Sequence, residues 1–294
     1  MLNGLLLVLA LVILAWSMKY ESFHTSDKLR VVTVVTNPNH AYLQWLKQSA
    51  AKHNLPVDVL VSEKPIGHGA QGQFGMKIQL FYNHLMTLDD NDYAMFVDGY
   101  DVVINSNAQT ILERFYRITG GKDVALFSGE LYCWPDGDKH KDYDRLKPTT
   151  SHFKFLNSGT YMGKVSTLKR IIESRMEAVN ATIDDQRFFT DIYLTSNSIV
   201  LDHENAIFVA VCGVQDSLVH TPRGWFNPLS NSYPLVFHGN GCGRELWKSN
   251  IVPSVLDQPC LSMNLFASDV VMGAASLVIL MTLVVKAGQV WRHG

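Results

Sequence analysis

The sequence contains little cysteine and almost no net charge. Its 294 residues include 4 cysteines, 25 basic and 27 acidic side chains, which give a formal net charge of −2. Four scattered cysteines are too few for a disulfide-rich scaffold or a cysteine-based zinc site. A near-neutral chain has no bulk electrostatic attraction to nucleic acid, so we expect no nucleic-acid partner. Since the sequence has no repeat or low-complexity tract, its length indicates one globular domain with appended segments.

The appended segments are uncharged apolar runs at the two ends of the chain. Residues 5–16 form a run that is short for a spanning helix, which needs roughly 17–25 residues, but its length matches the core of a signal peptide or a short signal anchor. Residues 15–17 form a poor cleavage site, which favours a retained anchor. We therefore expect residues 1–18 to be a signal anchor or a signal peptide.

The C-terminal run, residues 270–285, can cross a thin bilayer if its flanking residues reach the interface. Lys286, Arg292 and His293 follow this run, and positive charge favours the cytosolic side of a membrane. We therefore expect a transmembrane segment at residues 268–287, in the endoplasmic reticulum or Golgi membrane.

The central domain, residues 29–255, would then be lumenal. An N-glycosylation sequon at Asn180 agrees with that location. A lumenal domain permits a disulfide bond. Four cysteines allow three sets of pairings, and a bond between Cys242 and Cys260 is one option.

Predicted strands and helices alternate through the central domain. Apolar and β-branched runs predict strands at residues 29–36, 57–61, 93–97, 124–128 and 234–237. Helical spacing predicts helices at residues 41–53, 76–86 and 108–116. The glycine-rich stretch 67–75 must be a loop, and the polar stretch 134–150 is a surface loop or a lid. The alternation predicts an α/β domain with a parallel sheet covered by helices on both faces.

Two acids follow the strand at residues 93–97. In open α/β sheets ligands bind beyond the carboxyl ends of the strands, and Asp98 and Asp101 stand at such an end with Gly99 between them. Two carboxylates so placed can hold a divalent cation that bridges the oxygens of a pyrophosphate. The alternative is an ordinary acidic turn after a strand.

The motif His238-Gly239-Asn240-Gly241 follows another apolar strand. An imidazole at a strand end can join a metal site, and mixed oxygen and nitrogen ligation suits manganese better than calcium. The glycines let the backbone approach phosphates closely. A turn with an exposed histidine is the alternative.

Three further features carry polar groups. Asn157-Ser158-Gly159 offers amide and hydroxyl groups for sugar hydroxyls, although this composition is also common in turns. Asp184 and Asp185 can act on an acceptor hydroxyl, although Thr182 with Asp185 also resembles a helix cap. Lys77 can meet a phosphate as a point charge or can be an ordinary solvated helix residue.

Taken in order, these features resemble the glycosyltransferase domain of the multifunctional procollagen lysyl hydroxylases over about residues 30–250. The matching motifs are Gly75-Met76-Lys77, Phe96-Val97-Asp98-Gly99-Tyr100-Asp101-Val102, Phe127-Ser128-Gly129-Glu130, Cys133-Trp134-Pro135, Phe155-Leu156-Asn157-Ser158-Gly159, Asp184-Asp185-Gln186, Leu201-Asp202-His203, Ile207-Phe208 and His238-Gly239-Asn240-Gly241. The resemblance implies a GT-A type nucleotide-sugar fold, a Rossmann-like mixed sheet flanked by helices. It also implies a manganese ion and a UDP-sugar donor.

The resemblance assigns roles to matching positions. The implied metal ligands are Asp98, Asp101 and His238. The implied nucleotide-sugar-binding residues are Lys77, Asp98, Asn157, Ser158, Gly159, Gly239, Asn240 and Gly241. Asp184 and Asp185 would be active-site acids near the donor sugar, and Trp134 would line the acceptor side. The implied reaction moves glucose or galactose from UDP-glucose or UDP-galactose to a protein or glycan acceptor, which in this family is hydroxylysine of collagen or its galactosyl derivative.

The sequence also departs from this family. The family usually has serine at the position of Gly99, a difference that should leave the implied metal ligands untouched. It tends to have Pro-Thr-Lys at the position of Cys242-Gly243-Arg244, which alters the groups near the phosphates. A hydroxylase domain does not fit after residue 255, so we expect no lysyl hydroxylase activity. Two other functions are compatible with the residues: a non-catalytic membrane protein that binds nucleotide sugars or glycans, and a phosphodiesterase with water as the acceptor.

Overall fold

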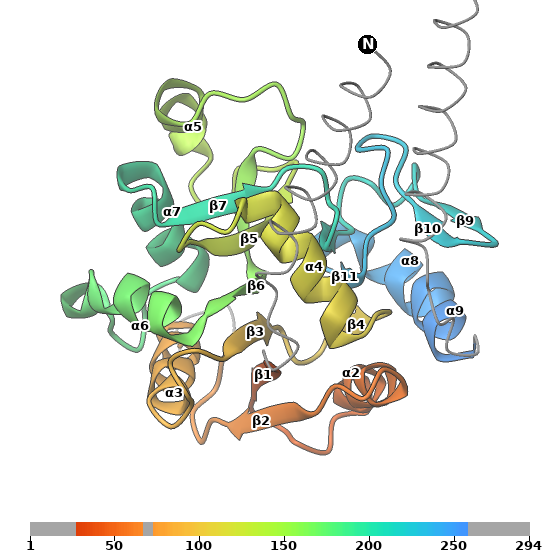
Figure 1. Ribbon diagram of the computed structural model, residues 1–294, viewed down its shortest axis with the longest axis horizontal. Coiled ribbons are helices and arrows are strands. Elements are labelled where there is room, and N and C mark those ends of the chain that lie inside the picture. The colour runs from red at the N-terminus through yellow and green to blue at the C-terminus, as the bar shows by residue number, and fades with distance from the viewer. Residues whose placement is uncertain (1–27, 67–72, 258–294) are drawn as a thin grey trace, which may run out of the picture. The chain divides into compact units, whose positions relative to one another are not determined.

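The computed structural model describes residues 28–66 and 73–257, and its elements are drawn in Figure 1. The helices are α2 (Ala41–Lys52), α3 (Gly75–Leu85), α4 (Ala108–Thr119), α5 (His140–Leu146), α6 (Val165–Glu173), α7 (Asp185–Thr195), α8 (Arg244–Leu246) and α9 (Val252–Asp257). The strands are β1 (Leu29–Val35), β2 (Val57–Val61), β3 (Tyr93–Val97), β4 (Val102–Ile104), β5 (Ala125–Glu130), β6 (Phe155–Lys164), β7 (Ile199–Asp202), β8 (Phe208–Ala210), β9 (Val219–Thr221), β10 (Gly224–Phe226) and β11 (Val236–His238). The eight predicted strands and helices are present, with ends shifted by a few residues.

A sheet of six strands lies at the centre of the described domain, in the order β2–β1–β3–β6–β5–β7. β1 pairs in parallel with β2 and β3, and β5 pairs in parallel with β7. β6 runs antiparallel to both β3 and β5. The sheet is therefore mixed, as the family resemblance implied, and the parallel arrangement predicted from the alternation of strands and helices holds only for β2–β1–β3 and β5–β7. The end of β5 pairs with the start of β6, at Glu130 and Phe155, so the chain returns from the same edge without the crossover that parallel strands need.

Helices cover both faces of this sheet (Figure 1). α3, α6 and α7 pack on one face through residues such as Phe81, Leu168 and Phe189. α2 and α4 pack on the other face through residues such as Leu46 and Phe115. Alternate residues of β1 and β3 belong to the two layers, which explains why both strands carry apolar side chains on both faces.

A smaller sheet, β4–β11–β8, continues from the carboxyl end of β3. β4 starts directly after Asp101 and pairs antiparallel with β11, which pairs in parallel with β8. Phe237 of this sheet packs with the fully buried Trp247 in a third apolar cluster. Because residues 98–101 connect β3 to β4, the acids lie where the two sheets meet.

Two stretches differ from the sequence-based predictions. Residues 157–159, whose composition is common in turns, lie inside β6, and the pairing of β6 with β5 shifts register between Phe127 and Ser128. The polar stretch 134–150 is not wholly irregular, because it contains a 3-10 turn and the short helix α5. Tyr143 is the buried residue of α5, and its hydroxyl accepts a hydrogen bond from the Leu156 N–H (3.1 Å). A single buried residue gives no helical periodicity to detect.

Several expectations lie outside the described residues. They concern the signal segment and the transmembrane segment, together with most of the glycine-rich loop 67–75. The optional Cys242–Cys260 pairing was wrong, because Cys242 forms a disulfide with Cys212. Within residues 28–66 and 73–257, no helix is long and apolar enough to cross a membrane.

Candidate active site

Asp98, Asp101 and His238 come together at the junction of the two sheets. The Asp98 N–H donates to the Gly159 carbonyl of the neighbouring β6 (2.8 Å). His238 is the last residue of β11 and is buried, so it is not an exposed turn histidine. Its Nε2 lies 3.6 Å from Oδ2 of Asp98 and 3.6 Å from Oδ1 of Asp101. Ligand atoms of the three residues all lie within 4.8 Å of one another, which is close enough for one shared cation.

The donor atoms of this cluster fit a divalent metal ion. The Oδ1 atom of Asn157 lies 3.1 Å from Nδ1 of His238 and also accepts the Gly159 N–H (3.0 Å). An amide oxygen only accepts hydrogen bonds, so Nδ1 of His238 donates and the lone pair of the neutral imidazole is on Nε2, which faces the two acids. A metal-binding histidine is commonly oriented by such a bond at its other nitrogen. The set of two carboxylates and one imidazole suits manganese better than calcium.

Burial and neighbouring charges shift the pKa values of Asp98, Asp101 and His238 in different ways. Burial raises the pKa of Asp98, although Lys77 opposes this effect. Burial would also raise the pKa of Asp101, but His238 and Arg244 lower it. Burial would lower the pKa of His238, yet the neighbouring acids Asp101 and Asp98 raise it. A metal ion bound to Nε2 would have to displace the proton that these acids favour.

Lys77 connects the metal-ligand cluster to α7. Its Nζ lies 2.8 Å from Oδ1 of Asp98 and 2.8 Å from Oδ2 of Asp185. Burial would lower the pKa of Lys77, but the two carboxylates raise it well above its usual value. Lys77 is therefore a buried cation and not a solvated helix residue. Gly75 allows the start of α3 to pack closely against Asn180, because a Cβ at Gly75 would lie 1.8 Å from the Asn180 carbonyl oxygen.

The two candidate acids of α7 have different surroundings. Asp185 is buried, and its Oδ2 accepts a hydrogen bond from the Ser158 hydroxyl (3.0 Å) in addition to the ion pair with Lys77. Asp184 is the N-cap of α7, with its side chain accepting the Arg187 N–H (2.9 Å). The cap predicted from Thr182 with Asp185 was thus misplaced, because the helix starts two residues later than that pattern suggests.

The glycines after His238 have structural roles. The Gly239 N–H donates to the Asp101 carbonyl (2.7 Å), and a Cβ at Gly239 would lie 2.4 Å from the Trp247 ring. Gly241 has a φ of +46°, a conformation that favours glycine. Asn240 lies between them and reaches toward β5.

Glu130 is a site residue that residue-by-residue reasoning did not single out. It ends β5 and is 4% exposed. Its Oε1 accepts from Gln186 Nε2 (2.8 Å), and its Oε2 accepts from Asn240 Nδ2 (3.2 Å). Gln186 also donates to the Trp134 carbonyl (2.8 Å), so Glu130 is linked to the half-exposed Trp134. The sequence carried one signal for Glu130, because it is an acidic residue at the end of a buried strand.

Arg244, which the sequence marked only as a departure from the family near the phosphates, also belongs to the site. Its Nη2 lies 2.8 Å from Oδ2 of Asp101. Lys77 on Asp98 and Arg244 on Asp101 therefore place one cation beside each acidic ligand. Arg244 is 143 residues away from Asp101 in the chain, so only the fold reveals the pair.

Burial raises the pKa of Glu130 to about 7, which predicts a pH-dependent stability. The folded protein holds a proton that the unfolded chain releases above its ordinary pKa near 4.5. The stability from this group is complete below about pH 4.5 and is lost as pH rises through 7, by an amount on the order of 3 kcal/mol. Glu130→Gln mimics the protonated form, so wild type should lose stability relative to the variant between pH 5 and 8.5. Urea unfolding with a chelator present measures this, and parallel pH profiles of the two proteins would contradict it.

Comparison with known proteins gives relatives over most of this chain. An uncharacterized protein, R699, of Acanthamoeba polyphaga mimivirus is 32% identical over 231 residues, which cover 77% of this chain and 49% of the relative. A multifunctional procollagen lysine hydroxylase and glycosyltransferase of Caenorhabditis elegans is 30% identical over 277 residues, covering 82% and 37%. The Homo sapiens protein of that description, LH3, is 30% identical over 229 residues, covering 73% and 30%. The chain thus spans about half or less of the length of these relatives.

Among solved structures, a glycosyltransferase involved in the glycosylation of the major capsid of PBCV-1 aligns with a TM-score of 0.43 and 11% identity, covering 76% of this chain and 98% of that one. The sequence pattern of one family, the PLOD GT domain, matches residues 25–250. These residues include every side chain of the site described above. The chain therefore belongs to the PLOD GT domain family and carries its glycosyltransferase domain.

Proposed function

We propose that this chain transfers a hexose, glucose or galactose, from a UDP-sugar in a manganese-dependent reaction on a GT-A type fold. The observation that carries the proposal is the convergence of Asp98, Asp101 and His238 within 4.8 Å, beside the buried cation Lys77. The four residues lie at the carboxyl ends of β3 and β11 and on α3, which is where α/β sheets bind nucleotides. The family membership supports the same reaction.

The charges of the site suit a leaving nucleoside diphosphate. When bound, a divalent ion would supply positive charge to the diphosphate oxygens as the bond to the sugar breaks. Asp98 and Asp101 together offset the charge of such an ion, and Asp185 offsets that of Lys77, so the charge of Arg244 remains for the diphosphate. In this proposal Asn157, Ser158 and the turn 239–241 bind the nucleotide sugar. Both cations already lie within 2.8 Å of the acidic ligands.

We place the acceptor on the side of Trp134. This residue is 58% exposed, and an exposed indole can stack on a sugar ring. Asp184 and Asp185, at the start of α7, are the candidate acids for positioning the donor sugar and the acceptor hydroxyl. Two relatives are described as procollagen lysine hydroxylases and glycosyltransferases, so a hydroxylysine in a collagen-like protein is the first acceptor to test.

We also propose that the domain works in the lumen of the secretory pathway, held to the endoplasmic reticulum or Golgi membrane. Cys212 and Cys242 form a disulfide, and disulfides persist in oxidising compartments such as this lumen. The apolar runs within residues 1–18 and 268–287 are the proposed membrane segments. The glycosyltransferase domain of the proposal is residues 29–255.

The test is release of UDP from a panel of UDP-sugars by the purified protein. We expect release from UDP-glucose or UDP-galactose that requires Mn²⁺, stops with a chelator, and accelerates with peptides carrying hydroxylysine or galactosyl-hydroxylysine. Tight UDP binding with no release from any donor would indicate the non-catalytic binding protein instead. Slow release that no acceptor accelerates would indicate hydrolysis with water as the acceptor.

A further inference from the structure

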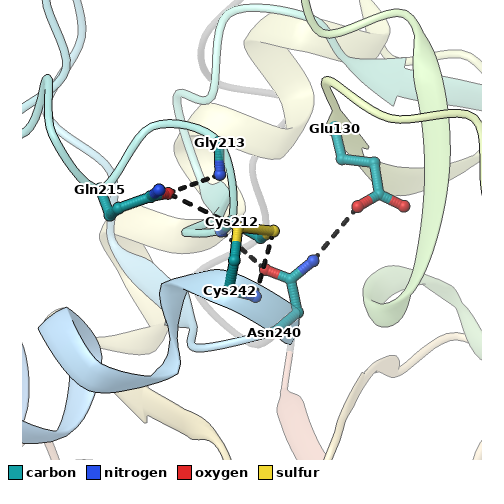
Figure 2. Close-up of a disulfide and its surroundings, with 6 residues drawn as sticks. All are labelled: Glu130, Cys212, Gly213, Gln215, Asn240 and Cys242. Atoms are coloured by element: carbon teal, nitrogen blue, oxygen red, sulfur yellow. Dashed lines mark hydrogen bonds between the residues drawn. A yellow bond between two sulfur atoms is a disulfide. The ribbon is translucent and has the colours of Figure 1, made fainter.

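The turn that follows His238 is closed by a disulfide bond. Cys242 lies in the 3-10 turn Gly241–Gly243, and Cys212 lies two residues beyond the end of β8, the parallel neighbour of β11. The bond joins residues that are 30 apart in the chain, with their Cα atoms 4.9 Å apart (Figure 2). Cys133 forms no disulfide with another described residue, and Cys260 lies outside the described ranges.

The two residues that flank this turn, Asn240 and Arg244, have side chains that reach the candidate active site. Asn240 donates to Oε2 of Glu130 (3.2 Å), as Figure 2 shows. Arg244, two residues after Cys242, pairs with Asp101 (2.8 Å). The turn therefore contacts both the metal-ligand cluster and the buried acid of β5.

The backbone of Cys212 also holds the side chain of Asn240. The Cys212 N–H donates to Oδ1 of Asn240 (3.0 Å), which directs the amide nitrogen toward Glu130 (Figure 2). The Cys242 N–H lies 3.2 Å from the Cys212 sulfur. Gly241 and Cys242 are exposed and Asn240 is partly exposed, so apolar burial of their side chains does little to hold this part of the turn. Glycine loses much backbone conformational freedom when it becomes ordered. The Cys212–Cys242 disulfide reduces the number of open conformations that the turn can adopt.

We propose that the Cys212–Cys242 disulfide is a positioning element of the donor site, so that the oxidised protein binds the UDP part of the donor well and the reduced protein binds it poorly. The inference rests on the proposed function, because it concerns the nucleotide of that reaction. Loss of one hydrogen bond to a charged group such as a phosphate weakens binding by about ten- to a hundred-fold. We therefore expect reduction to weaken UDP binding by about this factor.

The experiment compares oxidised and reduced protein in saturating Mn²⁺. Dithiothreitol reduces the disulfide to two thiols and is itself oxidised to its cyclic disulfide. Calorimetry gives the affinity for UDP, turnover gives KM and kcat, and circular dichroism with thermal unfolding checks that the domain stays folded. We expect KM for the donor to rise more than kcat falls, whereas a general loss of folded protein would lower kcat and leave KM unchanged.

Two variants separate this role from other effects of the reductant. Cys212→Ser with Cys242→Ser should bind UDP as weakly as reduced wild type and should no longer respond to dithiothreitol. Cys133→Ser should keep the full response of the wild type. Should the double variant fold poorly, reduction of folded wild-type protein decides the question alone.

The outcomes that overturn the two proposals differ. Equal UDP affinity in the oxidised and reduced states would overturn the positioning role, whatever the turnover. An oxidised wild type that binds UDP but releases it from no donor would overturn the transferase proposal, and the ratio of UDP affinities would still decide the role of the disulfide. An oxidised wild type that binds no UDP would overturn both.

Discussion

Replacing Asp98 with asparagine is expected to reduce UDP release by at least about 100-fold and to abolish measurable Mn²⁺ binding. Oδ2 of Asp98 faces His238 Nε2 at 3.6 Å, so the variant removes one of three charged or imidazole ligands and keeps the shape of the side chain. The metal-free domain should stay folded. Lys77 retains its ion pair with Asp185 at 2.8 Å, and the variant removes a carboxylate whose burial is unfavourable.

Three measurements are needed: UDP release, calorimetric Mn²⁺ binding, and thermal unfolding with a chelator. Asp123→Asn is a matched control, because Asp123 also pairs with a cation, Arg170, at 2.8 Å but lies at the surface outside the site. This control should keep both metal binding and turnover. Full activity of Asp98→Asn would remove Asp98 from the catalytic machinery and the metal site from the proposal.

Gly159→Ala is expected to inactivate the site although it replaces none of the three proposed metal ligands. A Cβ at Gly159 would lie 2.1 Å from Cε1 of His238 and 2.8 Å from its Nε2. The imidazole would have to move by about 1 Å, and displacements of this size cost about 100-fold in rate. The movement would also strain the bond from His238 Nδ1 to Asn157 (3.1 Å). We expect Mn²⁺ affinity and UDP release to fall together.

The matched control for this variant is Gly163→Ala, in the same strand. A Cβ at Gly163 would lie 3.3 Å from the Cα atom of Ala125 and 3.3 Å from Leu168, so it crowds the core and not the site. This control should lower the thermal midpoint while leaving Mn²⁺ affinity unchanged. If Gly159→Ala bound Mn²⁺ as wild type does, the imidazole could not be the third ligand in the position described.

The sequence predicted best the site residues that lie at the end of a buried strand. Asp98 follows a fully apolar strand, and a chain leaving a buried strand must place its next residues at the sheet edge. That rule placed Asp98, Asp101 and His238 at strand ends, the family resemblance implied that they share a metal ion, and the structure brings the three together. The rule does not depend on neighbours far away in the chain.

Other features depend on distant contacts and were not predictable. Residues 157–159 have the composition of a turn, but the pairing of Asn157 with Ser128 of β5 and the hydrogen bond from the Asp98 N–H to the Gly159 carbonyl hold them in β6, so tertiary structure overrides local preference. The same holds for the ion pairs of Lys77 with Asp185 and of Arg244 with Asp101, whose partners come from different elements. A sequence shows that a charged residue exists, but not which opposite charge it meets.

The position of the cluster between two sheets has a thermodynamic consequence. Asp98 follows β3 of the large sheet, whereas His238 belongs to the small sheet β4–β11–β8. An ion held by both would join two units that otherwise could open separately, and local opening at this edge would first have to release it. The free energy of that opening would then grow with the logarithm of the ion concentration, so the rigidity of the small sheet would follow the metal content of the compartment.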